Sequence, residues 1–285
     1  MQLAVLSGKG GTGKTTVAVG IAEVIKENIK IDCDVDASNM YLYYNGQEIN
    51  REKFYAGKTA KINLEKCIKC KQCVLHCQFN AISNYQIDSL KCEGCGVCNL
   101  VCPVGAIELT DNYIADIIEE QVKDGNLIRA DMTIGADGSG KVITELRNKV
   151  ETEKGIIIID GSPGIGCPVV ASLTGVDLCL VVSEPTLSGL SDLKRVLKVI
   201  ANFKIRALVC INKYDLNLKM TEQIKEYCNK NQIEIIGQIP YDELVIKSIN
   251  DLKPITLFKE SKASKEIKKI ANKIFEIYKE REECL

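Results

Sequence analysis

Eight cysteines in the middle of the chain have a spacing that can bind iron–sulfur clusters. They form two runs of the pattern C-x₂-C-x₂-C-x₃-C, and each cysteine of the first run has a counterpart 25 positions later. Three thiolates in one tight loop can bind three irons of a four-iron cluster, while the fourth cysteine lies too far along the chain and reaches the other cluster. We therefore expect two [4Fe-4S] clusters, one bound by Cys67, Cys70, Cys73 and Cys102 and the other by Cys77, Cys92, Cys95 and Cys98.

Zinc is the alternative metal for paired cysteines. A zinc site takes four ligands from two C-x₂-C pairs and has no use for three equally spaced cysteines followed by a fourth, so the pattern favours clusters. Pro103 follows the second run, as is typical of the motif, whereas Gln78 stands at the equivalent place after the first. His76 is the only histidine and lies beside Cys77. Because eight cysteines already satisfy two clusters, we expect a surface histidine.

A second set of residues can bind the phosphates of a nucleotide. The segment that begins at Gly8 matches G-x-x-x-x-G-K-[ST] between an apolar run and a helical pattern, where a phosphate-binding loop must lie. Its glycines let backbone N–H groups turn toward phosphates, Lys14 can reach the outer phosphates, and Thr15 offers a hydroxyl to Mg²⁺. The expected nucleotide-binding residues of this loop are Gly8, Lys9, Gly10, Gly11, Thr12, Gly13, Lys14, Thr15 and Thr16.

Carboxylates follow two further apolar runs. Asp32, Asp34 and Asp36 come at the end of one run, and Asp160 ends another, just before a glycine-rich segment. The carboxyl ends of strands are where an α/β sheet binds its ligands. An unpaired aspartate such as Asp160 at the end of a buried strand is costly unless an ion lies nearby.

The elements that must position these residues are alternating strands and helices. Short apolar runs at 3–6, 29–32, 156–159, 178–182, 207–211 and 233–236 indicate strands that are buried on both faces. Helical patterns cover about 14–27, 188–203, 219–231, 241–252 and 264–282. We predict an α/β fold with a doubly wound, mostly parallel sheet, formed by residues 1–60 and 111–285. Residues 61–110 follow neither pattern and are expected to form a small inserted domain that its cofactors organise.

The composition limits which classes of partner the chain is expected to bind. A formal net charge of −1 on 285 residues gives no field that would attract nucleic acid or an acidic membrane, so we expect neither partner. No window approaches the roughly 18 apolar residues of a membrane-spanning helix. The opening apolar run is too short for a signal peptide, which favours a cytoplasmic protein. The apolar face of the last helical pattern should pack on the sheet, with membrane association as the lesser alternative.

Six cysteines lie outside the two runs, and most of them are expected to be small buried hydrophobic residues. They are Cys33, Cys167, Cys179, Cys210, Cys228 and Cys284.

The phosphate loop resembles the deviant Walker A motif of the MinD, ParA and nitrogenase iron protein class. Over residues 1 to about 255 the chain resembles MinD superfamily P-loop ATPases that contain an inserted bacterial-type ferredoxin domain. The segments 161–168 and 183–189 take part in this resemblance. It implies an ATP-dependent homodimer in which Lys9 reaches the ATP of the partner. The alternative is that Lys9 is a solvated loop charge.

The resemblance also implies roles for the carboxylates and the glycine-rich segment. Asp34 would hold the attacking water, Asp32 would support the Mg²⁺ shell, and Asp160 would bind Mg²⁺ through water. Gly164 would sense the γ-phosphate. Lys9, Lys14 and Asp34 would then be the catalytic residues of an ATPase, because phosphoryl transfer depends mainly on positioning and charge neutralisation.

The base-binding residues are ambiguous in the sequence. Asn212 to Asp215 matches N-K-x-D, which reads guanine in many GTPases, whereas in MinD-type ATPases the asparagine contacts adenine. The loop around Pro240 resembles the second base contact of that family. The deviant phosphate loop favours ATP, with GTP as the alternative.

Cys167 lies seven residues after Asp160, where the nitrogenase iron protein has a cysteine that bridges a cluster across its dimer. The second cysteine which that protein requires has no counterpart, so we expect a structural role.

These motifs lead to one principal function and two rivals. The principal hypothesis is an ATPase that couples a nucleotide-driven dimer switch to electron transfer or metallocofactor maturation, acting on an unidentified redox protein or metalloprotein. One rival is a MinD-like positioning or partition ATPase with structural or sensing clusters. The other is an iron–sulfur scaffold or carrier.

Overall fold

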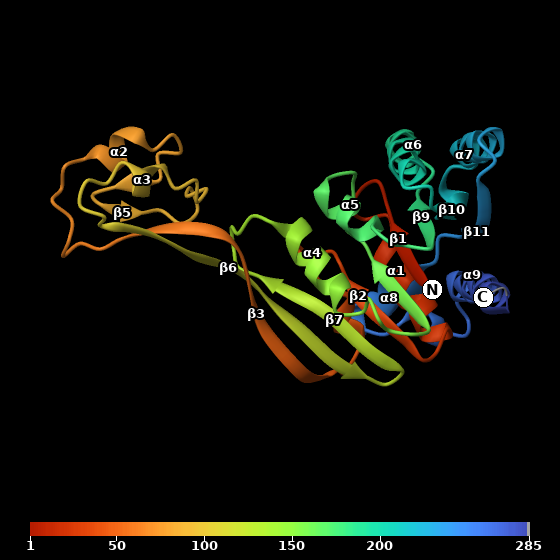
Figure 1. Cartoon of the computed structure of the whole chain (residues 1–285). Coiled ribbons are helices and arrows are strands. Elements are labelled where there is room, and N and C mark those ends of the chain that lie inside the picture. Colours follow the sequence, from red (N-terminus) through yellow and green to blue (C-terminus); the bar gives the residue numbers. More distant parts are fainter. Residues whose placement is uncertain (284–285) are drawn as a thin grey trace. The chain divides into compact units, whose positions relative to one another are not determined.

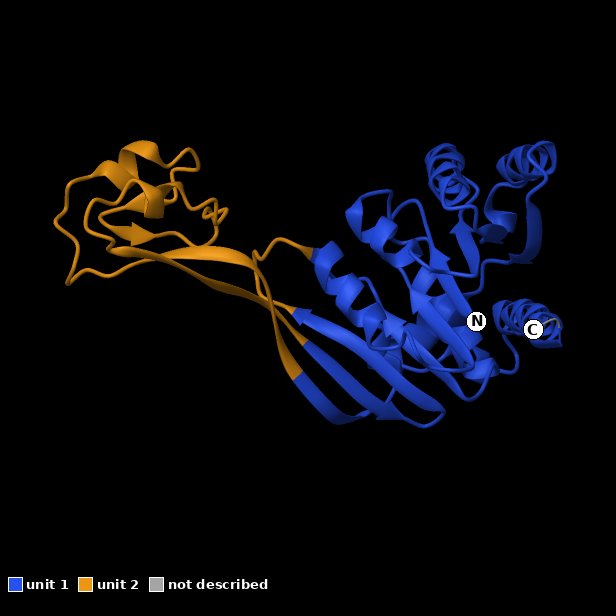
Figure 2. Cartoon of the chain, in the orientation of Figure 1, with its two compact units in different colours: residues 1–51, 117–131, 139–285 blue, residues 52–116, 132–138 orange. Residues whose placement is uncertain are grey.

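The computed structural model describes residues 1–283, which separate into two compact units (Figure 2). Unit 1 consists of residues 1–51, 117–131 and 139–285, and unit 2 consists of residues 52–116 and 132–138. The segment 61–110, expected to be the insertion, lies within unit 2, which extends beyond it at both ends. The reason is that two long strands flank the cysteines, and the units divide within these strands.

Unit 1 is built on a sheet whose strands follow the order β11-β10-β9-β1-β8-β2-β7-β6-β3. The strands are β1 (Gln2–Leu6), β2 (Asn28–Asp32), β3 (Gln47–Ile62), β6 (Ile107–Val122), β7 (Gly125–Met132), β8 (Ile156–Asp160), β9 (Leu178–Ser183), β10 (Arg206–Asn212) and β11 (Glu234–Ile239). The helices are α1 (Lys14–Val24), α4 (Ser139–Asn148), α5 (Cys167–Leu173), α6 (Leu187–Asn202), α7 (Leu218–Lys230), α8 (Glu243–Asn250) and α9 (Lys262–Glu283). Short 3₁₀ turns are η1 (Met40–Tyr43), η2 (Tyr214–Leu216) and η3 (Ile255–Leu257).

The strands from β11 to β7 are paired in parallel, and both faces of the central ones are buried. Every residue of β8 and of β9 is buried, which explains their continuous apolar runs. Figure 1 shows helices on both sides of this part of the sheet. The predicted α/β fold with a mostly parallel sheet is therefore confirmed.

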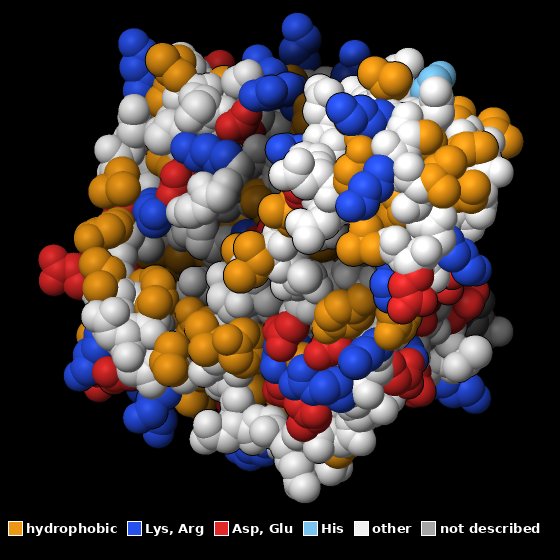
Figure 3. All heavy atoms as spheres, turned by 90° about the vertical axis from the view of Figure 1, so that its left-hand side faces the viewer, with side chains coloured by type: hydrophobic (Ala, Val, Ile, Leu, Met, Phe, Trp, Pro, Cys, Tyr) orange, Lys and Arg blue, Asp and Glu red, His pale blue; other side chains and the backbone are white. Residues whose placement is uncertain are grey.

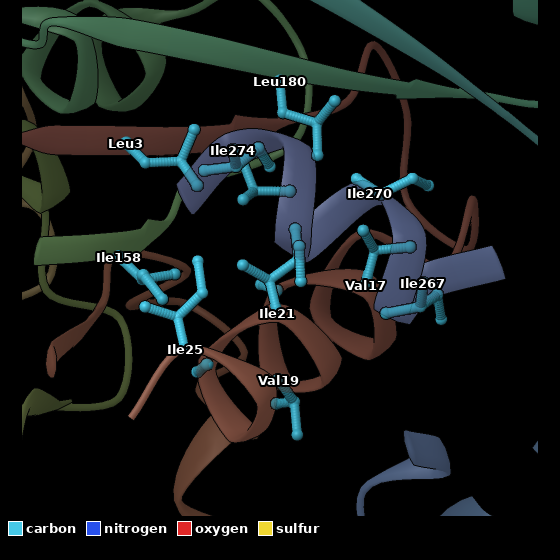
Figure 4. Packing of buried hydrophobic residues seen from close by; sticks show 14 of the residues in the cluster. Leu3, Val17, Val19, Ile21, Ile25, Ile158, Leu180, Ile267, Ile270 and Ile274 are labelled. Carbon is cyan, nitrogen blue, oxygen red and sulfur yellow. The ribbon is translucent and has the colours of Figure 1, made fainter. Parts of the chain in front are cut away.

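The C-terminal helix α9 packs on α1 and the sheet (Figure 4). Its residues Ile267, Ile270 and Ile274 are buried in one cluster with Val17 and Ile21 of α1. Each fully buried side chain of this size contributes roughly 1.5–3 kcal/mol to folding. The expected packing role of this helix is confirmed. No helix in residues 1–283 has the length and apolar character needed to cross a bilayer.

The other end of the sheet was not predicted. Strand β7 pairs in parallel with β2, and a two-residue turn at Lys123 and Asp124 joins it to β6, so β6 runs antiparallel to β7. Strand β3 closes the order as an edge strand.

Unit 2 has little core of its own. Besides parts of β3 and β6 it contains only short elements, namely α2 (Gln72–His76), β4 (Ile82–Ser83), β5 (Gln86–Ile87) and α3 (Val97–Leu100). Its buried cluster consists of Ala60, Cys73, Ile82, Cys98 and Ile107. A core this small does not stabilise a domain without a metal or another crosslink.

The scattered cysteines largely behave as expected. Cys33, Cys179, Cys210 and Cys228 are buried, and burial raises the pKa of each thiol. Cys167 is exposed at the start of α5. Cys284 lies outside the described residues.

Candidate functional site

The phosphate loop connects β1 to α1, and its lysine lies against a buried aspartate. Lys14 is the first residue of α1, and its Nζ is 2.6 Å from Oδ1 of Asp160 and 3.7 Å from Oδ2 of Asp34. The Thr15 hydroxyl donates to the other oxygen of Asp160 at 2.6 Å. Burial alone would lower the pKa of Lys14, but the carboxylates of Asp160, Asp34 and Asp32 outweigh it, so the pKa is raised. Lys14 is therefore charged at neutral pH.

Asp32 and Asp160 are neighbours across β2 and β8, and neither is exposed to solvent. Asp32 accepts hydrogen bonds from Ser38 Oγ and from the backbone N–H groups of Asp34, Asn39 and Met40. Burial and the charge of Asp160 raise the pKa of Asp32 to about 6. The carboxylate of Asp32 thus organises the loop that carries Asp34, and its expected support of the Mg²⁺ shell stays a prediction.

Asp34 lies at the surface of this charge cluster. It is partly buried, which raises the pKa of its carboxyl, while the proximity of Lys14 acts in the opposite direction. A carboxylate that is reachable from solvent and close to the phosphate-loop lysine is in a place where it can orient a water molecule.

Backbone geometry accounts for two of the predicted glycines. Gly13 has φ 86°, and a Cβ atom there would lie 2.4 Å from Nδ2 of Asn212. Gly164 has φ 98°, and its N–H donates to the Ser7 carbonyl at 2.9 Å, which holds the segment after β8 against the start of the phosphate loop. Only glycine adopts such backbone angles without strain.

Two adjoining cavities meet at the phosphate loop. One, of about 340 Å³, is lined by phosphate-loop residues together with Asp34 and Pro163. The other, of about 230 Å³, lies beside Asn212, Pro240 and Tyr241. Gly11, Gly13 and Thr16 line both cavities. Such a pair of cavities can hold the two ends of one nucleotide, with the phosphates in the first and the base in the second.

The residues expected to bind the base are arranged around the second cavity. Asn212 Nδ2 donates to the Thr12 carbonyl at 2.8 Å, so one of its two amide protons is directed to the phosphate loop. Asp215 of the N-K-x-D segment accepts the N–H of Tyr241 at 2.7 Å. Asp215 therefore fixes the loop after β11 through one of its two carboxylate oxygens.

Lys9 takes part in an ion network that the sequence did not indicate. Its Nζ lies 3.2 Å from Ser188 Oγ and 3.7 Å from Glu184 Oε2, and Lys213 Nζ lies 2.6 Å from the other oxygen of Glu184. Glu184 directly follows β9, where functional residues of a parallel sheet gather, and this position was the available signal.

The eight clustered cysteines divide between two cavities within unit 2. One cavity is lined by Cys67, Cys70, Cys73 and Cys102, and the other by Cys77, Cys92, Cys95 and Cys98. In each set three thiols come from one run and the fourth from the other run. This grouping is the same as the crosswise assignment made from the spacing.

The cysteines are held by a local backbone pattern that repeats with the sequence. The N–H of Ala81 contacts Cys77 Sγ at 3.4 Å, and the N–H of Ala106 contacts Cys102 Sγ at 3.2 Å. A third such contact joins Ala60 N–H to Cys92 Sγ at 3.5 Å. Hydrogen bonds of this kind stabilise the negative charge on ligating sulfurs.

Four thiols line each of the two cavities, which is the number of cysteine ligands that a four-iron cluster takes. His76 is exposed, and its Nδ1 lies 2.9 Å from the Gln72 carbonyl, as expected for a surface histidine.

Comparisons with known proteins agree with this fold. Residues 3–255 match the model of the CobQ/CobB/MinD/ParA nucleotide binding domain. A protein of Methanocaldococcus jannaschii whose name assigns no function is 34% identical over 281 residues, which cover 97% of both chains. The solved structure of the septum site-determining protein MinD with Mg-ADP, from Pyrococcus horikoshii, covers 96% of this chain and 95% of its own at a TM-score of 0.61 and 18% identity.

A shorter match concerns a different kind of protein. The pyruvate synthase subunit PorD of Methanothermobacter marburgensis is 41% identical over 49 residues, which make up 17% of this chain and 60% of that subunit.

Proposed function

Because the chain belongs to the CobQ/CobB/MinD/ParA family of nucleotide-binding domains, we propose that it is an ATPase that couples nucleotide binding to electron transfer or metallocofactor maturation through two [4Fe-4S] clusters. The chain combines a phosphate-binding loop with two sets of four cysteines. A protein that only positioned or partitioned a cargo would need the first feature and not the second.

The main support for the two redox clusters is the division of the cysteines between two cavities. All eight thiols take part, each cavity takes four, and each set crosses between the two runs. A tight loop supplies three ligands to one cluster and its last cysteine to the other, as the two-cluster spacing requires. When bound, the clusters would supply one-electron redox chemistry. The short match to a pyruvate synthase subunit agrees with this proposal.

The main support for the ATPase activity is the charge cluster at Lys14. Lys14 would bind the outer phosphates, and the Thr15 hydroxyl with Asp160 would hold Mg²⁺, directly or through water. Asp34 would orient the attacking water. Asn212 and Pro240 would contact the base, and the deviant phosphate loop favours adenine over guanine.

The switch would act through dimerisation. Lys9 is one-third exposed at a surface that also carries Ser188 and Glu184, where a second copy of the chain could present its nucleotide. ATP binding would then close a dimer, and hydrolysis would open it. The partner that receives electrons or metal is a separate redox protein or metalloprotein.

One experiment tests both halves together. The full chain is purified without oxygen, its iron is counted, and the electron paramagnetic resonance spectrum of the reduced protein is recorded with ATP, with ADP and without nucleotide. We expect about eight irons per chain, signals of two interacting clusters, and a nucleotide-dependent change in these signals and in sedimentation. If the protein were colourless and contained zinc or no metal, the proposal of two redox clusters would be wrong. If neither the cluster signals nor the sedimentation changed with nucleotide, the proposed coupling would be wrong.

A further inference from the structure

The two cysteine loops of unit 2 are copies of each other that differ in charge. The cysteines and their cavities correspond, yet three positions between the cysteines differ in charge. Ile68, Lys69 and Lys71 of the first loop stand where Glu93, Gly94 and Gly96 stand in the second.

The two lysines occupy positions at which the backbone favours glycine. Lys69 has φ 57° and Lys71 has φ 65°, and the corresponding Gly94 and Gly96 have φ 61° and 80°. A side chain in this left-handed region costs roughly 1–2 kcal/mol, which glycine avoids. Because the second loop shows that glycine satisfies the same geometry, local folding does not explain the lysines. Backbone strain of this kind gathers at functional sites.

These lysines lie next to the cysteines of the first four-cysteine site in the chain and are termed its rim, and Lys71 also lines the cavity itself. Lys66, Lys69 and Lys71 are exposed, and within residues 1–283 none of them forms an ion pair. Ile68 and Lys71 line the same cavity as Cys70, which is itself exposed, and the Ile68 side chain is 60% exposed. In Figure 3, exposed hydrophobic and basic side chains mix around the single histidine, which belongs to the neighbouring helix α2.

The second site lacks such a rim. Lys91, the counterpart of Lys66, pairs with Asp88 at 3.3 Å, and Glu93 lines the cavity where Ile68 lines the first. Unpaired lysines between the cysteines are therefore confined to one of the two sites.

We propose that the lysine rim, formed by Lys66, Ile68, Lys69, Cys70 and Lys71, is the docking surface for an acidic redox protein. This inference rests on the proposed function, because it treats the cysteines as cluster ligands. The apolar Ile68 and the exposed Cys70 would lie at the centre of the contact, and the lysines would pair with carboxylates around the partner's own redox centre. Three lysines on a chain of net charge −1 are too few to hold a nucleic acid or a membrane.

The duplicated loop supplies the test variant. Changing Lys69→Gly and Lys71→Gly gives the first loop the residues of the second, removes two charges and relieves the strained backbone. We therefore expect the double variant to fold with its clusters intact. Lys69→Arg with Lys71→Arg keeps both charges, and Lys259→Ala with Lys265→Ala removes two exposed lysines of unit 1 that form no ion pair in the described part of the chain.

The first measurement uses two small oxidants of opposite charge on the reduced full chain. Each hexacyanoferrate(III) or hexaammineruthenium(III) takes one electron from the protein and leaves as the corresponding divalent-metal complex, with no proton transferred. At an ionic strength of about 0.01 M, the glycine variant should react with the anionic oxidant roughly tenfold more slowly and with the cationic oxidant faster. Both differences should shrink in about 0.5 M salt. The arginine variant should behave as the wild type.

The second measurement uses titration calorimetry to measure the direct binding of an acidic flavodoxin, which serves as the probe. We expect binding that weakens roughly tenfold in the glycine variant, returns in the arginine variant, and is unchanged in the Lys259 and Lys265 control. Equal binding by the glycine variant, or equal weakening in the control, would overturn the docking surface. So would lysine-dependent binding of duplex DNA or anionic vesicles without binding of the flavodoxin.

Iron content and spectra of the same samples separate the two proposals. If the wild type holds no clusters, the proposed function fails. If the clusters are present and neither measurement depends on the lysines, only the docking surface fails.

Discussion

Asp160 shows how one carboxylate can serve a buried cation and a metal site. It is fully buried and accepts from both Lys14 and Thr15. A buried charge is tolerated only when it is paired and hydrogen bonded. Mg²⁺ bound at Thr15 and Asp160 would therefore meet a carboxylate that its hydrogen bonds already hold in position.

Changing Asp160→Asn should abolish most ATP hydrolysis. The amide keeps the shape but removes the charge that faces Lys14 and Mg²⁺, so we expect a loss of at least about 100-fold in the hydrolysis rate. The uncompensated Lys14 should also lower the free energy of unfolding by about 3 kcal/mol. Phosphate release and urea unfolding measure the two effects. The exposed Asp36→Asn serves as the control, and an Asp160→Asn variant as active as this control would contradict the assigned role.

Lys30 is a buried lysine that the site does not use. Its Nζ donates to the carbonyls of Asn28 and Asp124 at 3.2 and 3.1 Å, and it lies 5.4 Å from the centre of the Tyr44 ring. Burial lowers the pKa of Lys30 to about 8, against the smaller opposing effects of Asp124 and Glu23. The folded protein therefore loses this proton before the unfolded chain does.

The lowered pKa of Lys30 can be tested by measuring the free energy of unfolding of the wild type and of Lys30→Met over a range of pH. Below pH 8 the lysine is charged in both states, and the folded state carries the full cost of burying the charge. Between about pH 8 and 10.5 the unfolded chain binds more protons than the folded one, so the stability contributed by Lys30 rises with pH. We expect the free energy of unfolding of the wild type to increase relative to Lys30→Met by up to about 3 kcal/mol across this window. A difference that does not vary between pH 7.5 and 10 would show that the lysine is not shifted.

At the residue scale, motifs with fixed chemistry were predictable and tertiary ion pairs were not. The phosphate loop and the grouping of the cysteines follow from spacing, and the places of Asp32 and Asp160 at strand ends follow from the apolar runs before them. The Glu184–Lys213 and Glu184–Lys9 contacts join residues far apart in the chain. The place of Glu184 directly after β9 indicates a functional residue there, but no local pattern indicates its two lysine partners.

At the scale of elements, hydrophobic periodicity decided what the sequence could predict. Strands β8 and β9 are wholly buried and read as apolar runs, and α6, α7 and α9 lie within two residues of the predicted helical ranges. Strand β3 was missed because most of its residues are exposed, so it has no buried face to leave an alternating pattern. Helix α4 was missed because its ten residues bury only Val142, Ile143 and Leu146.

The two cysteine loops should behave as crossed elements. Cys77→Ala should damage the same cluster as Cys92→Ala, because both thiols line one cavity. Each single variant should lose up to about four irons of about eight. The double variant Cys77→Ala with Cys92→Ala should lose no more than either alone, whereas Cys77→Ala with Cys67→Ala should damage both clusters.

Iron analysis and electron paramagnetic resonance follow these losses. Cys228→Ala, a buried cysteine of α7, is the control and should keep its iron. If Cys77→Ala were additive with Cys92→Ala and not with Cys67→Ala, the first run would bind its cluster alone and the crossed arrangement would be wrong.

At the scale of the whole molecule, the proposed dimer depends on Lys9. Its contacts with Ser188 and Glu184 are partly exposed, and such ion pairs contribute under about 1 kcal/mol to folding. Lys9→Ala should therefore leave the monomer stable and abolish ATP-dependent dimerisation, measured by sedimentation with a non-hydrolysable ATP analogue. Lys26→Ala removes another exposed lysine as the control. A Lys9→Ala chain that still dimerises with ATP would show that Lys9 is a solvated loop charge.

The strand order has a consequence for synthesis on the ribosome. Strand β1 pairs with β8 and β9, and β2 pairs with β7 and β8, so the first 32 residues have no sheet partner until residues after 124 have been made. At roughly 5–20 residues per second, the nascent phosphate loop waits several seconds for its neighbours. Both cysteine runs emerge during that delay, ahead of the strands that complete the nucleotide site. Any cluster that the cysteine runs bind could thus be loaded before the nucleotide site is complete.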